Sequence, residues 1–255
     1  MDPTPLQIAL LCAAALTAGV VDAIAGGGGL VTLPVLLATG LPPHVVLGTN
    51  KGQSVFGAFA ALVRFWRAGL VRAPLAVITF PLGFVGSFLG VALVLLMRPE
   101  VLKPVVLVLL VVVAFFLAFR RGPPPGPRPE PPLARVRALG AAIALLIGAY
   151  DGFFGPGTGT FLIIAFSGLL GHSLTHASAD AKVVNFATNL AAVALFAYRG
   201  LVLWHVALPM AAAQFTGAWL GAHLAVRGGD RLVRKVVLGV VVALVLKLGW
   251  DVLSR

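Results

Sequence analysis

Residues 26–51 read GGGGLVTLPVLLATGLPPHVVLGTNK. They place a glycine run, a short apolar segment and a lysine in a chain that otherwise consists of long apolar stretches. The pattern occurs twice, because residues 155–182 read GPGTGTFLIIAFSGLLGHSLTHASADAK. The glycines align at a shift of 129 residues, and Lys51 then aligns with Lys182 at a shift of 131. Matching that continues in this way along the following segments indicates an internal duplication.

The composition is that of a membrane protein. Hydrophobic residues make up 60% of the 255 residues, and charged residues only 11%, with a mean hydropathy of +1.03. Soluble domains carry roughly a quarter charged residues. The net charge of +11 would suggest nucleic acid in a soluble protein. Here the basic residues lie between apolar segments and set membrane orientation instead, so we expect no nucleic-acid partner.

The chain divides into ten apolar segments in two sets of five. Most are long enough for the ~20 residues that cross a bilayer core, but the second segment of each set is shorter and begins at glycines. Such paired short segments are typical of broken or re-entrant helices that line a transport site. The segments cover residues 6–25, 29–40, 44–63, 73–97, 101–119, 133–154, 159–171, 173–198, 201–226 and 232–253.

The predicted fold class is therefore an all-α polytopic membrane protein with roughly eight to ten transmembrane helices. Its two repeats are residues 1–121 and 133–255. Between them, residues 122–132 read GPPPGPRPEPP, and this run of prolines favours an extended linker.

Basic residues gather on the side of the linker. Twelve of them lie in loops on that side and five on the other. The rule that basic loops stay inside places the linker in the cytoplasm and both termini outside, in the inner membrane of the cell. Because each repeat has an odd number of segments, the second enters the membrane in the opposite direction. Inverted repeats of this kind are common in secondary transporters.

Both glycine stretches are interpreted as helix breaks. A break exposes backbone N–H groups at the start of the next half-helix, where the helix dipole favours an anion. Two half-helices that begin from opposite sides would meet near the middle of the membrane. A phosphate-binding loop is disfavoured because no Gly-Lys-Ser/Thr follows. Close helix packing through small residues is the structural alternative.

Lys51 and Lys182 begin the third segment of each set. A lysine inside a membrane helix costs about 2.5–3.5 kcal/mol on insertion scales, and a duplicated cost suggests that both bind an anion. Snorkelling to the interface is the alternative. The predicted substrate-binding set is Gly26, Gly27, Gly28, Gly29, Thr49, Asn50, Lys51, Ser54, Gly155, Gly157, Thr158, Gly159, Lys182, Asn185 and Asn189.

Three aspartates are candidates for carrying a coupling proton: Asp22, Asp151 and Asp180. Asp22 and Asp151 each precede a glycine break by four residues. They either pair with the lysines, cap the broken helices, or take up a proton, since desolvation disfavours a charged carboxylate. Asp180 stands two residues before Lys182, and residues two apart on a helix do not face each other.

Four motifs resemble the paired motifs of the TauE/SafE family of sulfite and organosulfur anion transporters, and most of all its YfcA-like branch. They are DAIAGGGGLVTLP (22–34), GTNK (48–51), YDGFFGPGTGTF (150–161) and ADAKVVN (179–185). The resemblance implies transmembrane passage of small anions such as sulfite, thiosulfate or sulfoacetate. The second copy departs from the usual glycine triplet, so the two halves of a site are not chemically equal.

The sequence thus predicts a secondary transporter of small anions with a site between inverted halves. A passive anion channel is the alternative. An intramembrane enzyme is disfavoured because no GxSG nucleophile, helix-core histidine pair or metal-ligand cluster occurs. The expected partners are the anion, the bilayer and protons, with no metal or other cofactor. Gly86-x3-Gly90 and Gly217-x3-Gly221 serve either internal packing or a homodimer.

Overall fold

The computed structural model describes residues 4–119 and 131–253, and all of their regular structure is helical. The first half contains α1 (Pro5–Ala25), α2 (Gly29–Leu37), α3 (Pro43–Arg67), α4 (Ala73–Leu95) and α5 (Pro99–Phe119). The second half contains α6 (Leu133–Phe153), α7 (Thr158–Leu170), α8 (Leu174–Tyr198) and α9 (Trp204–Leu253). The prediction of an all-α fold is confirmed.

The ten predicted segments correspond closely to these helices. The last two, residues 201–226 and 232–253, are joined in α9, which is interrupted by non-helical backbone at Gly229 (φ 56°, ψ −159°). The predicted linker, residues 122–132, lies outside the described residues except for its last two positions.

Four of the described helices, α1, α4, α6 and α8, are long and apolar enough to cross a membrane. Large apolar side chains such as Val77, Leu93 and Leu146 face outward, as expected for lipid contact. The chain is therefore a multi-pass membrane protein. α3 is as long as α8, and both helices carry buried polar residues, which in α3 are Thr49, Asn50, Lys51 and Gln53.

Helices of one half pack against helices of the other through glycines. α4 contacts α6, where a Cβ atom on Gly90 would lie 2.1 Å from the carbonyl oxygen of Ala149. α1 contacts α9, where a Cβ atom on Gly217 would lie 2.1 Å from the carbonyl oxygen of Leu16. The small-residue faces thus serve internal packing, the first of the two predicted alternatives.

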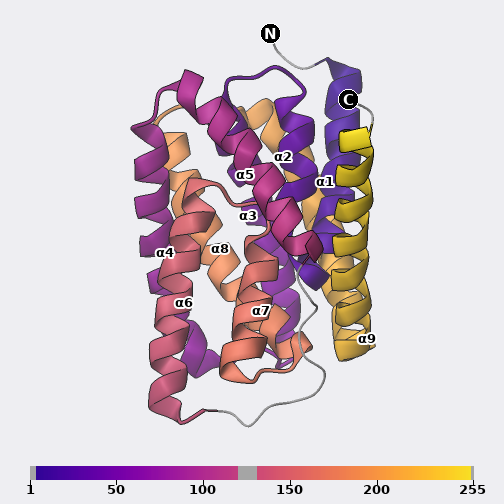
Figure 1. Cartoon of the computed structure of the whole chain (residues 1–255). Coiled ribbons are helices and arrows are strands. Elements are labelled where there is room, and N and C mark those ends of the chain that lie inside the picture. Colours follow the sequence, from indigo (N-terminus) through magenta and orange to yellow (C-terminus); the bar gives the residue numbers. More distant parts are fainter. Residues whose placement is uncertain (1–3, 120–130, 254–255) are drawn as a thin grey trace.

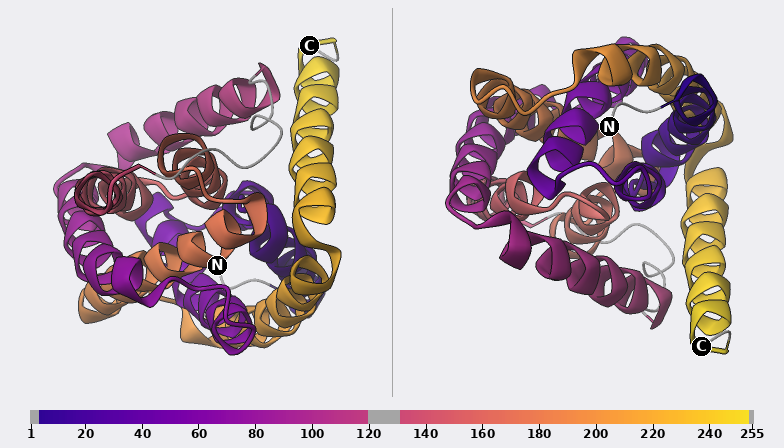
Figure 2. Two further views of the ribbon diagram at one scale, coloured as in Figure 1. Left: turned by 90° about the horizontal axis from the view of Figure 1, so that it is seen from below. Right: turned by 90° about the horizontal axis from the view of Figure 1, so that it is seen from above.

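The two halves enter the bundle from opposite ends. α1 begins and α9 finishes at one end, whereas α6 begins at the other (Figure 1). The short helices α2 and α7 lie in opposite parts of the bundle. Seen along the long axis, α5 and the last part of α9 lie at its periphery (Figure 2). Which end faces the cytoplasm, and the inverted relation of the repeats, stay predictions.

Both glycine stretches break the helices, as predicted. α1 ends at Ala25 and α6 at Phe153, and the breaks contain glycines with φ of 73° (Gly26), 95° (Gly27), 97° (Gly155) and 84° (Gly157). These left-handed values favour glycine over any residue with a Cβ atom. The breaks also touch, because a Cβ atom on Gly26 would lie 2.2 Å from the carbonyl carbon of Gly159. They meet inside the bundle.

The start of α8 is held by an aspartate from the interruption of α9. Asp230 accepts hydrogen bonds from the Thr175 N–H (2.8 Å), the Thr175 hydroxyl (2.5 Å) and the Leu174 N–H (3.2 Å). Partial burial by itself would raise the pKa of Asp230, but these bonds and one from Ser173 outweigh it and lower the pKa. The carboxylate caps the N-terminus of the helix that carries Lys182.

Candidate functional site

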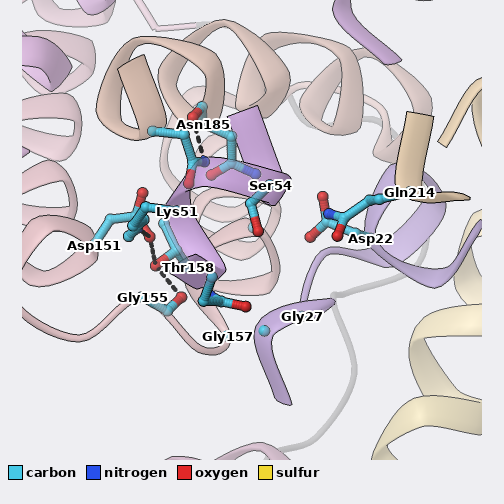
Figure 3. Close-up of a pocket in the computed structure, with 14 residues that line it drawn as sticks. Asp22, Gly27, Lys51, Ser54, Asp151, Gly155, Gly157, Thr158, Asn185 and Gln214 are labelled. Carbon is cyan, nitrogen blue, oxygen red and sulfur yellow. Dashed lines mark hydrogen bonds and ion pairs between the residues drawn. The ribbon is translucent and has the colours of Figure 1, made fainter. Parts of the chain in front are cut away.

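A small polar cavity lies where the two helix breaks meet (Figure 3). Its volume is about 40 Å³. One water needs roughly 10–15 Å³, so the cavity accommodates a group of a few non-hydrogen atoms. Both halves of the chain form its wall. The lining residues are Asp22, Gly27, Gly29, Asn50, Lys51, Ser54, Asp151, Gly155, Gly157, Thr158, Gly159, Asn185, Asn189 and Gln214.

One ion pair forms part of this wall. The Lys51 ammonium lies 2.9 Å from Asp151, and each side chain is only 4% exposed. Asp151 also accepts hydrogen bonds from the hydroxyls of Thr158 (2.9 Å) and Thr188. Both of its carboxylate oxygens therefore have side-chain donors, which offset the cost of burying the charge.

A second ion pair joins Lys182 to Asp22. The Lys182 ammonium lies 2.8 Å from Asp22 Oδ2 and is 0% exposed, whereas Asp22 is 18% exposed. The other carboxylate oxygen accepts the Gly28 N–H at 3.2 Å. Lys182 is not part of the cavity wall, and Asp22 is. The lysine therefore acts on the cavity through the carboxylate that it contacts.

Each pair crosses between the halves of the chain. The lysine on α3 meets the aspartate on α6, and the lysine on α8 meets the aspartate on α1. This is the ion-pair alternative considered for Asp22 and Asp151. Both lysines are buried within the bundle, which excludes snorkelling to the interface.

Most of the predicted substrate-binding residues line the cavity, but four do not. Gly26 packs against the backbone of Gly159, and Gly28 donates its N–H to Asp22. The Thr49 hydroxyl accepts the Leu203 N–H at 3.1 Å. Lys182 is the fourth. These residues shape the surroundings of the cavity rather than its wall.

Asp180 also lies away from the cavity. One carboxylate oxygen accepts the Arg72 N–H at 3.0 Å, and the other lies 3.0 Å from Nδ1 of the buried His172. In the first half, Thr49 aligns with Asp180, and its hydroxyl likewise accepts a backbone N–H from a loop, that of Leu203. The structure thus places Asp180 at the contact between α8 and the loop that precedes α4.

Several polar residues near the cavity were not predicted from the sequence. Gln214 on α9 lines the cavity and is 3% exposed. Thr188 lies one helical turn after Asn185 and could have been found by that spacing. Thr160 donates to the carbonyl oxygen of Ala25 at 2.9 Å, and Ser178 donates to that of Ala23 at 3.1 Å. These hydroxyls satisfy carbonyls at the broken end of α1.

The cavity wall carries one ammonium group, two carboxylates and several neutral donors. A Cβ atom on Gly155 would lie 3.0 Å from the Lys51 ammonium, so the glycine keeps the space beside this charge open. Thr158 and Gly159 belong to the first turn of α7, where backbone N–H groups lack acceptors within the helix. The Thr158 N–H bonds instead to the Gly155 carbonyl oxygen at 3.1 Å. Within the described residues, no group of three or more His, Cys, Asp or Glu side chains gathers to hold a metal ion.

A bundle of apolar helices around a polar cavity at two helix breaks is the architecture of a membrane transporter. Comparison with known protein families identifies the family of transporters. Residues 11–248 match the model for "Sulfite exporter TauE/SafE", and the chain belongs to this family. The family consists of membrane transporters, not enzymes, and this excludes the intramembrane enzyme considered from the sequence.

Curated relatives resemble the chain over nearly its whole length. A "Probable membrane transporter protein" of Haemophilus influenzae is 38% identical over 246 residues, which cover 96% of this chain and 95% of the relative. A "Probable membrane transporter protein YfcA" of Escherichia coli strain K12 is 34% identical over 252 residues, 97% of this chain and 91% of the relative. "Probable membrane transporter protein ORF9" of Sinorhizobium sp is 36% identical over 246 residues, 96% and 93% of the two chains. No solved structure matches the chain.

Proposed function

We propose that the protein is an inner-membrane secondary transporter of small sulfur-containing anions such as sulfite or thiosulfate. It alternates access to one site between two inverted repeats, residues 1–121 and 133–255. The observation that carries this proposal is the cavity at the meeting point of the two helix breaks, whose wall comes from both halves. Such a site is opened to either side by rocking one repeat against the other.

The chemistry of the cavity wall supports an anion. Lys51 contributes an ammonium group, and charge-assisted hydrogen bonds to oxyanions are stronger than neutral ones. Asn185, Asn189 and Ser54 contribute neutral side chains with hydrogen-bond donors. The glycines allow the backbone N–H groups at the start of α7 to approach a ligand closely.

The size of the cavity supports a compact anion and a carrier mechanism. A volume of about 40 Å³ suits sulfite better than an extended organosulfonate. This small volume also favours a carrier, which holds one ion at a time, over a channel with a continuous aqueous pore. Membership of the sulfite exporter TauE/SafE family supports a sulfur-containing substrate.

The proposal is tested first by binding. Purified protein is heated with sulfite, thiosulfate, sulfoacetate, taurine and simple carboxylates, because a ligand of the folded state raises the melting temperature by mass action. We expect sulfite and thiosulfate to stabilise the protein, and acetate to have no effect. Stabilisation by none of these anions would contradict the proposed substrate class.

Transport is then measured in vesicles that contain the purified protein. Saturable uptake of labelled sulfite, and exchange of internal for external sulfite, are expected of a carrier. Ohmic single-channel currents in a planar bilayer would instead identify a passive anion channel. Empty vesicles and vesicles with the Lys51→Met variant serve as controls, since this variant lacks the ammonium group in the cavity wall.

A further inference from the structure

The charges at the cavity balance before any substrate is present. Lys51 and Lys182 contribute two positive charges, and Asp22 and Asp151 contribute two negative ones. An entering anion adds a negative charge that none of these groups is free to neutralise. In a medium less polar than water, uncompensated charge is costly. Binding of an anion therefore calls for a positive charge that arrives with it.

The two aspartates are not equivalent as acceptors of that positive charge. Asp151 receives three side-chain donors, from Lys51, Thr158 and Thr188. Asp22 receives one ammonium group and one backbone N–H, and it is more exposed to the cavity. The cause lies in the sequence, because the positions aligned with Thr158 and Thr188 are occupied in the first half by glycines, Gly29 and Gly57.

An unsatisfied acceptor lies in the same part of the cavity wall. The side-chain oxygen of Gln214, Oε1, is buried and has no hydrogen-bond partner among the described residues. Asp22 and Gln214 both line the cavity (Figure 3). Their helices are in direct contact, since a Cβ atom on Gly19, one turn before Asp22, would lie 2.5 Å from the Gln214 carbonyl oxygen. A buried acceptor without a donor is costly and calls for an explanation.

We infer that Asp22 takes up a proton when the anion binds, and that the new hydroxyl donates a hydrogen bond to Gln214 Oε1. This inference rests on the proposed function. A proton from the aqueous phase adds to Asp22 Oδ1. This oxygen accepts the Gly28 N–H at 3.2 Å, which is longer than the 2.8 Å contact between Oδ2 and Lys182. Lys182 keeps its proton, so the site gains one positive charge. One proton then crosses with the anion, so that hydrogensulfite moves without net charge and thiosulfate, a dianion, moves with one net negative charge.

The other charged groups around Asp22 support this assignment. Lys182 faces it from α8. Among the described residues of the cavity wall, the other titratable groups are Lys51 from α3 and Asp151 from α6, and these are paired with each other. α9, α7 and the break before α2 contribute neutral residues to the wall: Gln214, Thr158 and Gly27. Asp22 is thus the carboxylate in the wall with fewer donors and greater exposure.

The test measures protons directly. Thiosulfate, whose charge is constant near neutral pH, is added to purified wild-type protein in weakly buffered solution with a pH indicator. We expect an uptake of about one proton per thiosulfate bound. Asp22→Asn should abolish the uptake and make the thiosulfate affinity independent of pH. Asp180→Asn is the matched control, because Asp180 lies outside the cavity, and it should keep the proton uptake per bound anion.

The outcomes separate the inference from the proposed function. If wild-type protein binds thiosulfate without proton uptake, or if Asp22→Asn keeps the uptake, the inference is wrong and the transporter proposal stands. If wild-type protein binds no thiosulfate and no other anion of the thermal screen, the proposed function fails first.

A second variant covers the case in which Asp22→Asn does not fold. Gln214→Leu removes the acceptor but leaves the Lys182 pair intact. We expect at least tenfold weaker thiosulfate binding at neutral pH, with recovery as the pH is lowered, because the carboxyl has lost its hydrogen-bond partner. A pH profile of binding identical to that of the wild type would overturn the role of Gln214 and, with it, the inference.

Discussion

Lys182 lies 2.8 Å from Asp22, although 160 positions separate them in the chain. Lys51 and Asp151 repeat this relationship with the two halves exchanged. Each pair therefore ties one half of the protein to the other at the level of the cavity. Any movement of one half against the other must carry both pairs along or break them, and breaking a buried pair is costly unless another charge replaces the lost partner.

Replacing Lys182 should destabilise the protein more than it weakens binding by direct contact. Lys182→Met leaves the Asp22 carboxylate without its partner, which costs about 3–5 kcal/mol for a buried pair. We expect a much lower melting temperature in detergent. The double variant Asp22→Asn/Lys182→Met should recover a large part of the loss, because it leaves no unpaired charge. Equal melting temperatures for the single variant and the wild type would contradict the pairing.

Replacing Lys51 should weaken anion binding directly. Lys51→Met removes the ammonium group from the cavity wall, and we expect at least tenfold lower affinity for sulfite, about 1.4 kcal/mol or more. Lys51→Arg should restore binding only in part, because the planar guanidinium does not reproduce a compact ammonium. Affinity is measured by titration calorimetry on the folded variants. Wild-type affinity in Lys51→Met would place the site elsewhere.

The contact between the helix breaks should not tolerate a single methyl group. A Cβ atom on Gly26 would lie 2.2 Å from the backbone of Gly159, so Gly26→Ala must separate the breaks. Gly40→Ala is the matched control, because Gly40 has a similar φ of 79° but no atom within 4 Å of a Cβ. We expect loss of sulfite transport in the first variant and near wild-type transport in the second. Equal transport in both would show that the contact is unimportant.

Acid should weaken the capping of α8 by Asp230. The pKa of Asp230 is lower in the folded state, so its contribution to stability is complete above the ordinary aspartate pKa of about 3.9. It is lost as the pH falls through the lower folded value. Asp230→Asn should reduce the melting temperature at neutral pH by removing the charged cap, and the difference from wild type should shrink in strong acid. A difference that does not change with pH would contradict the role of the charge.

The orientation can be tested with single cysteines in a Cys12→Ser background. Leu133 at the start of α6 is 61% exposed, and Tyr198 at the end of α8 is 85% exposed. The distribution of basic residues places the first inside the cell and the second outside. In whole cells, an impermeant thiol reagent should label Tyr198→Cys and not Leu133→Cys, whereas both should react after lysis. The reverse pattern would invert the predicted orientation.

The sequence was sufficient for the helices, the two breaks and most of the cavity wall. Helix breaks are encoded locally, because only glycine adopts the φ values found at Gly26 and Gly155 without strain. The two lysines stood out because a buried charge is costly wherever it lies along a membrane helix. Asn185 and Asn189 followed from helical spacing, which places residues three or four apart on one face.

Only the tertiary structure decided which groups meet. Lys182 pairs with Asp22 from the other half rather than facing the cavity itself, and Asp180 faces a loop. Gln214 is a lone amide in an apolar segment and becomes part of the cavity because α9 packs against α1. These relationships depend on contacts between residues far apart in the chain. Local periodicity carries no information about such contacts, since they are set by how the glycine faces of different helices pack together.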